Sequence, residues 1–307
     1  MSDNLELSIF IPTFNEEIHI RRCIANARKI TKNIFVIDSY SKDKTIEIAL
    51  ELGATVVQYK WESDSNWSKK FNWALENVAF PTDWIMRLDA DEYATKDFIV
   101  EIRKILPQLS SEFTAICINR REYFMGRWMK HGGVYPKSMI RLFRKGSAFY
   151  EDRWLDEHVE VISGKIEYLN IDLCDDRKIS LSKWVEKHNS YSILEAIMLM
   201  DKEIGLFNRA VTSSKLDKQS LKKRKNKDMY SRLPLFWRAW AFFFYRYFIK
   251  MAFIDGFEGF LYSFLQCLWY RTLADAKIKE TYHNCGKDPE KILNYIKEEY
   301  AIDCRKK

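Results

Sequence analysis

The stretch Trp84-Ile85-Met86-Arg87-Leu88-Asp89-Ala90-Asp91-Glu92 places an apolar run directly before three acidic residues. The apolar run predicts a short buried strand, and strands of open α/β sheets present functional residues at their carboxyl ends. Carboxylates separated by one residue suit hard divalent cations such as Mg²⁺ or Mn²⁺, whose open positions phosphates can fill. The stretch therefore predicts a metal site for phosphate-ester chemistry, although an Asp-x-Asp triplet alone also occurs in ordinary solvated loops.

Strand patterns alternate with helix patterns around this stretch. The predicted strands are Leu7–Pro12, Asn33–Asp38, Ala54–Tyr59, Asp83–Leu88 and Thr114–Arg121. The predicted helices are Ile18–Ile30, Thr45–Leu52, Lys69–Val78, Asp97–Leu109 and Leu181–Met200. Such alternation predicts an α/β fold with a Rossmann-like, mainly parallel sheet, right-handed crossovers and flanking helices.

Length and composition narrow the classes of protein that the chain can form. Its 307 residues allow one large domain or one domain with an appendage, and 47% apolar residues exclude a disordered chain. The six cysteines contain no Cys-x-x-Cys pair, which disfavours structural zinc and favours reduced thiols in the cytosol. The polar start Met1–Glu6 does not resemble a secretory signal. No apolar run reaches the ~20 residues of a spanning helix.

Polar residues after the first two predicted strands are candidates for nucleotide binding. Pro12-Thr13-Phe14-Asn15-Glu16 offers backbone N–H groups and short polar side chains, and Asp38 ends the second strand. A carboxylate there can accept hydrogen bonds from a ribose or a base, although Asp38 could also cap a turn. No Gly-x-Gly-x-x-Gly follows the first strand, which disfavours a Rossmann dinucleotide site. No P-loop motif occurs, which excludes a P-loop kinase.

Three linked motifs resemble the family 2 glycosyltransferases of GT-A fold in order and spacing. They are Pro12–Glu16, Val36–Thr45 and Leu88–Glu92. Further segments resemble the bacterial branch of that family that builds lipopolysaccharide core, capsule and related lipid-linked glycans: Lys69–Leu75, Phe124–Arg127, His131–Pro136 and Arg141–Phe143. The resemblance is strong over about residues 5–200 and extends into the aromatic C-terminal block.

The resemblance implies a donor site for a UDP- or GDP-type nucleotide sugar. Thr13, Glu16 and Asp38 would contact the nucleoside, and Asp89 and Asp91 would belong to the Mg²⁺ or Mn²⁺ and diphosphate site. Of this pair Asp91 is favoured as the direct metal ligand. The whole donor-binding set is Pro12, Thr13, Asn15, Glu16, Asp38, Lys70, Asn72, Asp89, Ala90 and Arg141. A guanidinium suits a diphosphate, although Arg141 could also be an ordinary exposed charge on a strand.

Family members typically invert the anomeric carbon, and inversion requires a general base for the acceptor hydroxyl. In the related branch the corresponding place commonly reads His-Glu, which makes Glu157 the predicted base. In this chain Asp156 replaces the preceding His, so Asp156 is a rival base. The alternative is that the charged cluster Asp156-Glu157-His158 is only the start of a helix and has no catalytic role.

Residues 234–273 form an aromatic block interrupted by charges. Its longest uncharged run, Gly259–Tyr270, is twelve residues, too short to cross a bilayer but suited to a helix lying in the interface. Residues 215–232 hold eight Lys or Arg and two Asp or Glu, and an anionic membrane surface attracts such a run. An oligomer interface or a buried helical hairpin are the alternatives. Nucleic acid is disfavoured because the charges lie beside the aromatics instead of alternating with them.

Together these patterns predict two regions. Residues 1–210 would be a GT-A catalytic domain, with a donor half over about 1–92 and an acceptor half over about 93–210, and residues 211–307 would associate with the membrane. The predicted function is an inverting glycosyltransferase, peripheral or monotopic on the cytosolic face of the cell membrane, with a lipid-linked or lipopolysaccharide- or capsule-type acceptor. The alternatives are a polyprenyl-phosphate sugar synthase, whose ionised acceptor needs no base, and a non-catalytic membrane scaffold.

Overall fold

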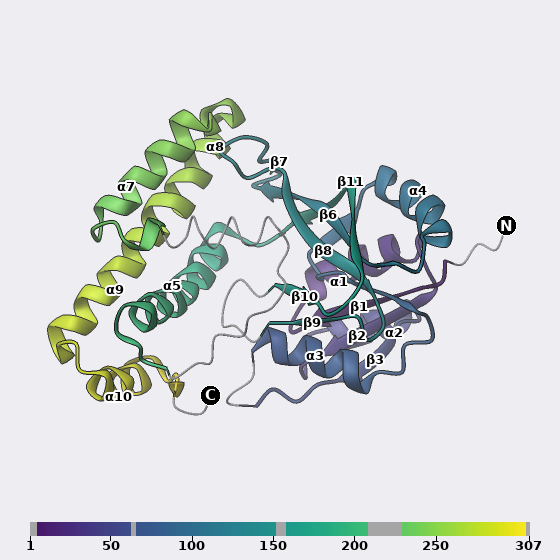
Figure 1. The fold of residues 1–307 in the computed structure, drawn as a ribbon, viewed down its shortest axis with the longest axis horizontal. Coiled ribbons are helices and arrows are strands. Elements are labelled where there is room, and N and C mark those ends of the chain that lie inside the picture. Colours follow the sequence, from purple (N-terminus) through teal and green to yellow (C-terminus); the bar gives the residue numbers. More distant parts are fainter. Residues whose placement is uncertain (1–4, 63–65, 152–157, 208–228, 305–307) are drawn as a thin grey trace. The chain divides into compact units, whose positions relative to one another are not determined.

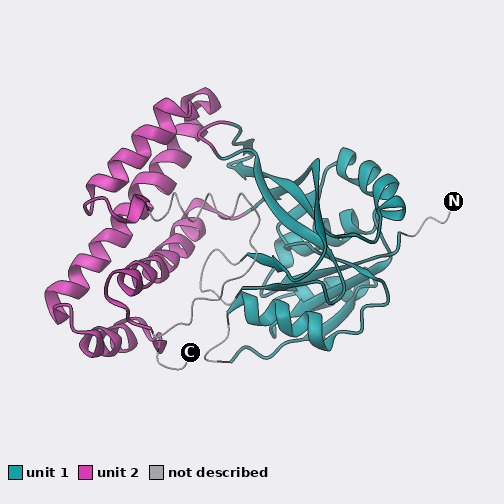
Figure 2. Ribbon diagram, in the orientation of Figure 1, with its two compact units in different colours: residues 1–130, 134–178 teal, residues 131–133, 179–307 magenta. Residues whose placement is uncertain are grey.

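The computed structural model describes residues 5–62, 66–151, 158–207 and 229–304 (Figure 1). The chain forms two compact units, residues 1–130 with 134–178 and residues 131–133 with 179–307 (Figure 2). The domain boundary predicted at residue 210 lies outside the described residues. Helix α5 (Leu181–Ile204), which the sequence assigned to the catalytic domain, clusters with the second unit.

The first unit is built on a mixed sheet. Its strands are β1 Leu7–Thr13, β2 Asn33–Asp38, β3 Thr55–Gln58, β4 Trp84–Arg87, β5 Glu92–Ala94, β6 Phe113–Phe124, β7 Arg127–Trp128, β8 Lys137–Arg144 and β11 Lys165–Asp176. The strand order is β3-β2-β1-β4-β8-β6-β11-β5, and β7 pairs with β6. A separate two-stranded sheet pairs β9 (Ala148–Tyr150) with β10 (Val159–Val161).

Strand direction changes along the sheet. The four strands β3, β2, β1 and β4 are parallel, as the strand–helix alternation predicts. Strand β8 runs antiparallel to both β4 and β6, and β5 runs antiparallel to β11. The α/β fold is therefore confirmed, with the antiparallel strands entering where the regular alternation ends after β4.

Helices cover both faces of this sheet because successive strand residues point to opposite sides. The helices are α1 Glu17–Ala27, α2 Thr45–Glu51, α3 Trp67–Asn77 and α4 Lys96–Ile105, followed by a 3₁₀ turn, η1 Leu106–Gln108. On β1, Ile9 and Ile11 join the core cluster that contains residues of α1, α2 and α4. Between them, Phe10 joins the cluster that contains Phe71 of α3 and Tyr150 of β9. The parallel part of the sheet thus lies between two hydrophobic cores, one on each face.

The second unit is helical. Besides α5 it contains α7 Trp237–Phe244, η2 Tyr245–Ile249, η3 Ala252–Asp255, α8 Gly256–Ser263, η4 Phe264–Trp269, α9 Tyr270–Cys285 and α10 Pro289–Tyr300. A buried core joins Ala239 and Phe243 of α7 to Cys267 and Leu268 of η4. Among the described residues, none of these helices has both the length and the apolarity required to cross a bilayer.

A short loop between β7 and β8 packs within the second unit. The His131 backbone N–H donates to Asp255 Oδ2 (2.8 Å), and His131 Nδ1 lies 2.7 Å from Asp255 Oδ1. The Gly132 N–H donates to the Lys250 carbonyl (2.8 Å). Gly132 has a φ of +67°, and a Cβ on it would lie 2.8 Å from the Ala252 Cβ. This close approach requires a glycine.

Candidate active site

The first candidate residues meet at the carboxyl ends of neighbouring parallel strands. Thr13 of β1 is in register with Asp38 of β2. The Leu88 N–H donates to the Phe10 carbonyl (3.1 Å), which holds the end of β4 beside β1. Asp38 and Asp89 therefore lie at one edge of the sheet, where open α/β folds bind ligands.

Asp38 is a fully buried carboxylate held by the last residue of β1 and by the turn that follows β2. The Thr13 hydroxyl donates to Oδ1 (2.8 Å), and the Ser41 N–H donates to Oδ2 (2.8 Å). The Ser41 hydroxyl also donates to Oδ1 (2.5 Å). These contacts satisfy the buried charge and fix the orientation of the carboxylate, and its contact with a nucleoside stays a prediction.

Lys70 of α3 is completely buried beside this carboxylate. Its Nζ donates to the Thr13 carbonyl and to the Ser39 hydroxyl, both at 2.8 Å. Burial lowers the pKa of Lys70 to about 7, and the negative charges of Asp38 and Glu16 oppose that shift. Lys70 therefore titrates close to neutral pH within the predicted donor site.

The turn after β1 is closed by its own polar groups. Asn15, with a φ of +55°, donates its N–H to the Ser41 hydroxyl (2.8 Å) and accepts the Lys42 N–H on Oδ1 (2.8 Å). Glu16 Oε2 lies 2.7 Å from His19 Nδ1, and His19 Nε2 accepts the Lys178 N–H (3.0 Å). Asn15 thus holds the turn in its conformation, whereas the Glu16 carboxylate contacts His19.

Pro12, Ala90 and Asn72 are the remaining residues of the predicted donor-binding set. Pro12 is buried in β1, and Ala90 is buried in the turn between the two aspartates. The Asn72 amide donates to the Tyr150 carbonyl (2.8 Å) and accepts the Tyr150 N–H (2.7 Å). Both ends of the Asn72 amide therefore hold β9 against α3, and its contact with the donor stays a prediction.

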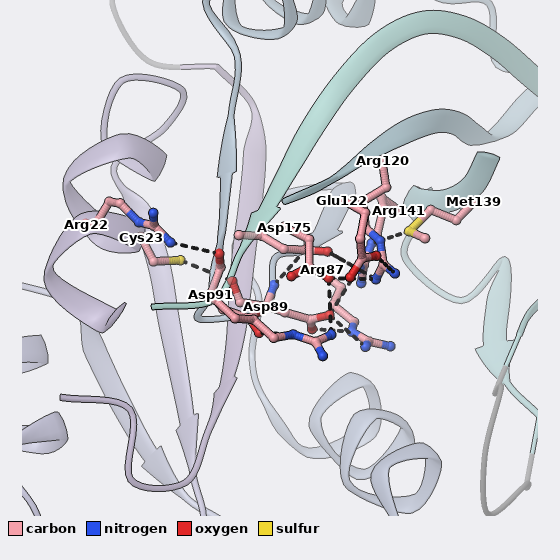
Figure 3. Close-up of polar contacts among 12 residues, drawn as sticks. Arg22, Cys23, Arg87, Asp89, Asp91, Arg120, Glu122, Met139, Arg141 and Asp175 are labelled. Atoms are coloured by element: carbon pink, nitrogen blue, oxygen red, sulfur yellow. Dashed lines mark hydrogen bonds and ion pairs between the residues drawn. The ribbon is translucent and has the colours of Figure 1, made fainter. Parts of the chain in front are cut away.

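Two arginines hold Asp89 (Figure 3). Arg87 donates from Nε to Oδ1 (2.8 Å) and from Nη2 to Oδ2 (3.0 Å). Arg141 of β8 donates from Nη2 to Asp89 Oδ2 (3.0 Å) and to Glu92 Oε1 (2.5 Å). Although burial opposes it, the charges of Arg141 and Arg87 lower the pKa of Asp89, so this carboxylate is ionised. Arg141, only 4% exposed, is thus a buried member of the site and not an ordinary exposed strand charge.

Asp91 is held on one side only. Arg177 Nε donates to its Oδ2 (3.0 Å), and Arg22 Nη2 donates to its backbone carbonyl (3.0 Å). Burial and the nearby Asp175 carboxylate raise the pKa of Asp91 to about 6, and Arg177 opposes the shift. Asp91 is therefore a buried carboxylate beside other carboxylates.

Further charged residues surround Asp89 and Asp91. Glu92 is fully buried and accepts the Asp89 N–H on Oε2 (3.1 Å). Burial raises the pKa of Glu92 to about 7, with Arg141 opposing the shift. Asp175 of β11 lies 3.3 Å from Arg120 Nη1 and 3.2 Å from Arg177 Nη2, and its Oδ1 is buried without a hydrogen bond. These contacts fix the turn that carries Asp89 and Asp91.

Asp91 fits a divalent cation better than Asp89 does. Both oxygens of Asp89 accept guanidinium donors, whereas Asp91 Oδ1 accepts no hydrogen bond from the residues that the structure describes. A cation would also offset the burial and the neighbouring carboxylates that raise the pKa of Asp91. No cluster of three or more His, Cys, Asp or Glu within the described ranges could hold a metal alone. The remaining ligands would therefore be phosphate oxygens and water, as is usual for Mg²⁺.

Several residues of this site were not singled out from the sequence. Arg22, Arg120, Asp175 and Arg177 reach the acidic turn from other elements, and no local pattern marks them. Arg87 carried a signal, because it is a charged residue inside an otherwise apolar strand. The two base candidates, Glu157 and Asp156, lie outside the described residues.

With this geometry in view, the sequence profile of glycosyl transferase family 2 matches residues 8–176. The chain belongs to glycosyl transferase family 2. The match runs from β1 to the end of β11 and so includes the Asp38, Asp89 and Asp91 turns. As a member of the family, the chain is a glycosyltransferase, and the resemblance seen in the sequence is confirmed.

Individual relatives agree with this assignment. An uncharacterized glycosyltransferase of Rickettsia felis is 26% identical over 285 residues, which cover 90% of either chain. The lipopolysaccharide core biosynthesis glycosyltransferase LpsC of Rhizobium meliloti is 27% identical over 208 residues, covering 64% of this family 2 chain and 72% of LpsC. The mannosyltransferase PcManGT of Pyrobaculum calidifontis, solved with GDP-Man and Mn²⁺, has a TM-score of 0.50 at 12% identity. That alignment covers 91% of this chain and 88% of the mannosyltransferase, and it supports the GT-A fold.

Proposed function

We propose that this glycosyltransferase is metal-dependent and inverting, and that it moves a sugar from a UDP- or GDP-type donor to a lipid-linked or lipopolysaccharide- or capsule-type acceptor. The observation that carries the proposal is Asp91, a carboxylate with one unengaged oxygen and a pKa raised to about 6, beside the guanidinium-held Asp89. Such a carboxylate gains more from a divalent cation than from solvent.

The chain would bind the two parts of the donor, the nucleoside and the diphosphate, with different residues. Asp38 would accept hydrogen bonds from the nucleoside, because Thr13 and Ser41 already hold its carboxylate in one orientation. Asp91 would hold the cation, and Mg²⁺ or Mn²⁺, when bound, neutralises the charge of a diphosphate leaving group. Arg87 and Arg141 would keep Asp89 ionised and oriented throughout.

The transfer also requires a base. We propose that Glu157, with Asp156 as the rival, removes the proton of the acceptor hydroxyl as that oxygen attacks the anomeric carbon and the diphosphate leaves from the opposite side. Both residues lie outside the described part of the chain, so this role rests on the sequence alone.

Similarity to a named relative supports the proposed acceptor class and the proposed membrane location. The relative LpsC is named for lipopolysaccharide core biosynthesis, and such acceptors carry a lipid. We therefore place the enzyme at the cytosolic face of the cell membrane, as a peripheral or monotopic protein. The exposed aromatic residues of the second unit support the same setting.

A panel of nucleotide sugars tests this function directly. Hydrolysis of UDP- and GDP-linked sugars would be followed in the presence of Mn²⁺ or Mg²⁺ and again with a chelator. We expect at least one donor to be hydrolysed slowly without acceptor, and the chelator to stop the reaction. If neither a UDP- nor a GDP-type donor is bound or hydrolysed with either metal, the proposed donor class is wrong.

A further inference from the structure

The α7–η2 segment carries a stripe of exposed aromatic rings. Trp240, Phe244 and Phe248 follow one another at four-residue spacing and are 48%, 51% and 51% exposed. Their rings stack in sequence, with centroids 6.1 Å apart from Trp240 to Phe244 and 5.6 Å apart from Phe244 to Phe248. A helical segment that presents its rings in this way has an apolar face that none of the described residues covers.

A second stripe continues the first. Phe257 of α8 (69% exposed) lies 6.4 Å from Phe260 (39%), and Phe260 lies 6.2 Å from Phe264 of η4 (39%). Tyr247 joins the two stripes, with its ring 5.0 Å from that of Phe248 and 5.7 Å from that of Phe260. We call the two stripes, together with Tyr247, the aromatic patch. A contiguous patch of this kind on a soluble surface marks an interaction site.

Two cations accompany the patch, Arg246 and Lys250. Arg246 lies over the ring of Phe242 (5.4 Å), and Lys250 over that of Tyr245 (5.7 Å). Within the described ranges neither has a carboxylate partner, and Arg246 Nε is buried with no acceptor. The other two basic residues of the aromatic block are paired, Arg238 with Asp275 and Arg271 with Glu195.

The β7–β8 loop lies against these two cations. His131 binds both carboxylate oxygens of the buried Asp255, one of only two acidic residues between positions 234 and 273. Gly133 lies beside the cations, since a Cβ on it would come within 3.8 Å of Lys250 Cγ and 4.0 Å of Arg246 Nε. Because Gly133 has no side chain, the buried Nε that lacks an acceptor faces only backbone at this position.

We infer that the aromatic patch rests on an anionic phospholipid bilayer and that Arg246 and Lys250 bind lipid phosphate groups at its edge. The inference deepens the membrane setting of the proposed function and rests on it. Aromatic rings prefer the headgroup layer. The exposed part of the Arg246 guanidinium and the exposed Lys250 ammonium, neither with a carboxylate partner within the described ranges, suit phosphate oxygens. A second copy of the chain fits less well, because a two-fold interface would bring Arg246 and Lys250 close to their own copies.

Vesicle binding of the full-length protein tests the aromatic part. Flotation with vesicles of phosphatidylcholine and phosphatidylglycerol would compare the wild type with a Phe248→Ser, Phe257→Ser double variant. We expect partitioning to fall by about tenfold or more, because two exposed rings lose their contact with lipid. The matched control is Val100→Ser with Ile162→Ser, which removes apolar residues of similar exposure (63% and 59%) from the first unit. The control should float like the wild type.

A second pair of variants tests the phosphate contacts. Arg246→Gln with Lys250→Gln should weaken binding to phosphatidylglycerol vesicles roughly 30-fold and weaken binding to pure phosphatidylcholine, whose headgroup has no net charge, much less. Lys96→Gln with Lys104→Gln, on exposed positions of α4, removes the same net charge and should have little effect. Lys250→Gln alone, at an exposed position, should still cost about fivefold if the double variant misfolds.

Three results would overturn the inference. The first is wild-type flotation of the phenylalanine variant, and the second is equal wild-type binding to both kinds of vesicle. The third is a dimer in light scattering that the phenylalanine substitutions dissociate while flotation persists, which would make the patch a protein interface. Calorimetry of UDP or GDP with Mn²⁺ separates this inference from the proposed function, because every variant should keep wild-type nucleotide affinity. A wild type that floats but binds no nucleotide would count against the proposed function alone.

Discussion

Arg87 grips Asp89 with two nitrogens, Nε at 2.8 Å from Oδ1 and Nη2 at 3.0 Å from Oδ2. The same guanidinium lies 3.8 Å from the centre of the Phe71 ring on α3, which fixes its plane. The first acid of the Asp-x-Asp pair is therefore held by an arginine that is itself held by the core. Asp91, whose side chain is bound by Arg177 alone among the described residues, is therefore the acid of the pair that is better suited to bind a cation.

Arg87→Lys keeps the positive charge and removes the guanidinium, which donates from two nitrogens to the two oxygens of Asp89. We expect donor affinity to fall about tenfold and the free energy of unfolding to fall by ~2 kcal/mol, because Asp89 would lose one of its two hydrogen bonds from residue 87 in a largely buried site. Calorimetry and denaturant unfolding measure the two effects. Arg21→Lys is the control, since Arg21 grips the exposed Glu51 with two nitrogens in the same way and should change neither quantity. Equal behaviour of the two variants would contradict a positioning role for Arg87.

Lys70 predicts a specific pH dependence of stability. Its pKa is about 7 in the folded protein against an ordinary value of 10.5, so the unfolded chain binds more protons between these two pH values. The contribution of Lys70 to the free energy of unfolding therefore rises with pH over that window, by up to ~1.4 kcal/mol per pH unit. Denaturant unfolding at several pH values above 7 should show this rise in the wild type and in Lys69→Met, but not in Lys70→Met. Parallel pH profiles for Lys70→Met and the wild type would contradict the burial of a titrating lysine.

Local patterns predicted the strands well and the charge network poorly. The strand predicted over Asn33–Asp38 has those bounds in the structure, because an apolar run of this length that ends in a polar turn is a local signal. The burial of Lys70 could not be foreseen, since its partners Thr13 and Ser39 lie 57 and 31 residues away in the chain. Arg177 meets Asp91 across 86 residues. Such pairs depend on strand order in the sheet, which periodicity does not encode.

Gly132→Ala tests the close packing of the β7–β8 loop in the second unit. A Cβ at Gly132 would lie 2.8 Å from the Ala252 Cβ, so we expect a loss of ~2–3 kcal/mol in the free energy of unfolding. Gly126→Ala is the matched control, because Gly126 also has a positive φ (+80°) but nothing lies within 4 Å of its Cβ position. It should lose only ~1 kcal/mol. Thermal unfolding of both variants gives the difference, and a Gly126→Ala loss as large as that of Gly132→Ala would rule out the contact.

Glu157→Gln distinguishes two kinds of acceptor. A hydroxyl acceptor needs a base, so kcat should fall by roughly 10²–10⁴-fold while donor affinity stays the same. Asp156→Asn should have a much smaller effect if Glu157 is the base. Turnover of both variants would be measured with a lipid-linked glycan and with a polyprenyl phosphate as acceptor. Transfer to the polyprenyl phosphate that is unchanged in Glu157→Gln and Asp156→Asn alike, without transfer to the glycan, would favour the polyprenyl-phosphate synthase, whose acceptor is already ionised.

The central claim is that Asp91 holds the cation that binds the donor diphosphate. Calorimetry of UDP or GDP, with and without Mn²⁺, should show metal-enhanced binding in the wild type and in Asp97→Asn, which changes an exposed acid on α4. In Asp91→Asn the enhancement should disappear, while the variant stays folded because Arg22 still binds the backbone carbonyl of residue 91 and the amide oxygen can still accept from Arg177. Metal-enhanced binding of wild-type strength in Asp91→Asn would contradict the account.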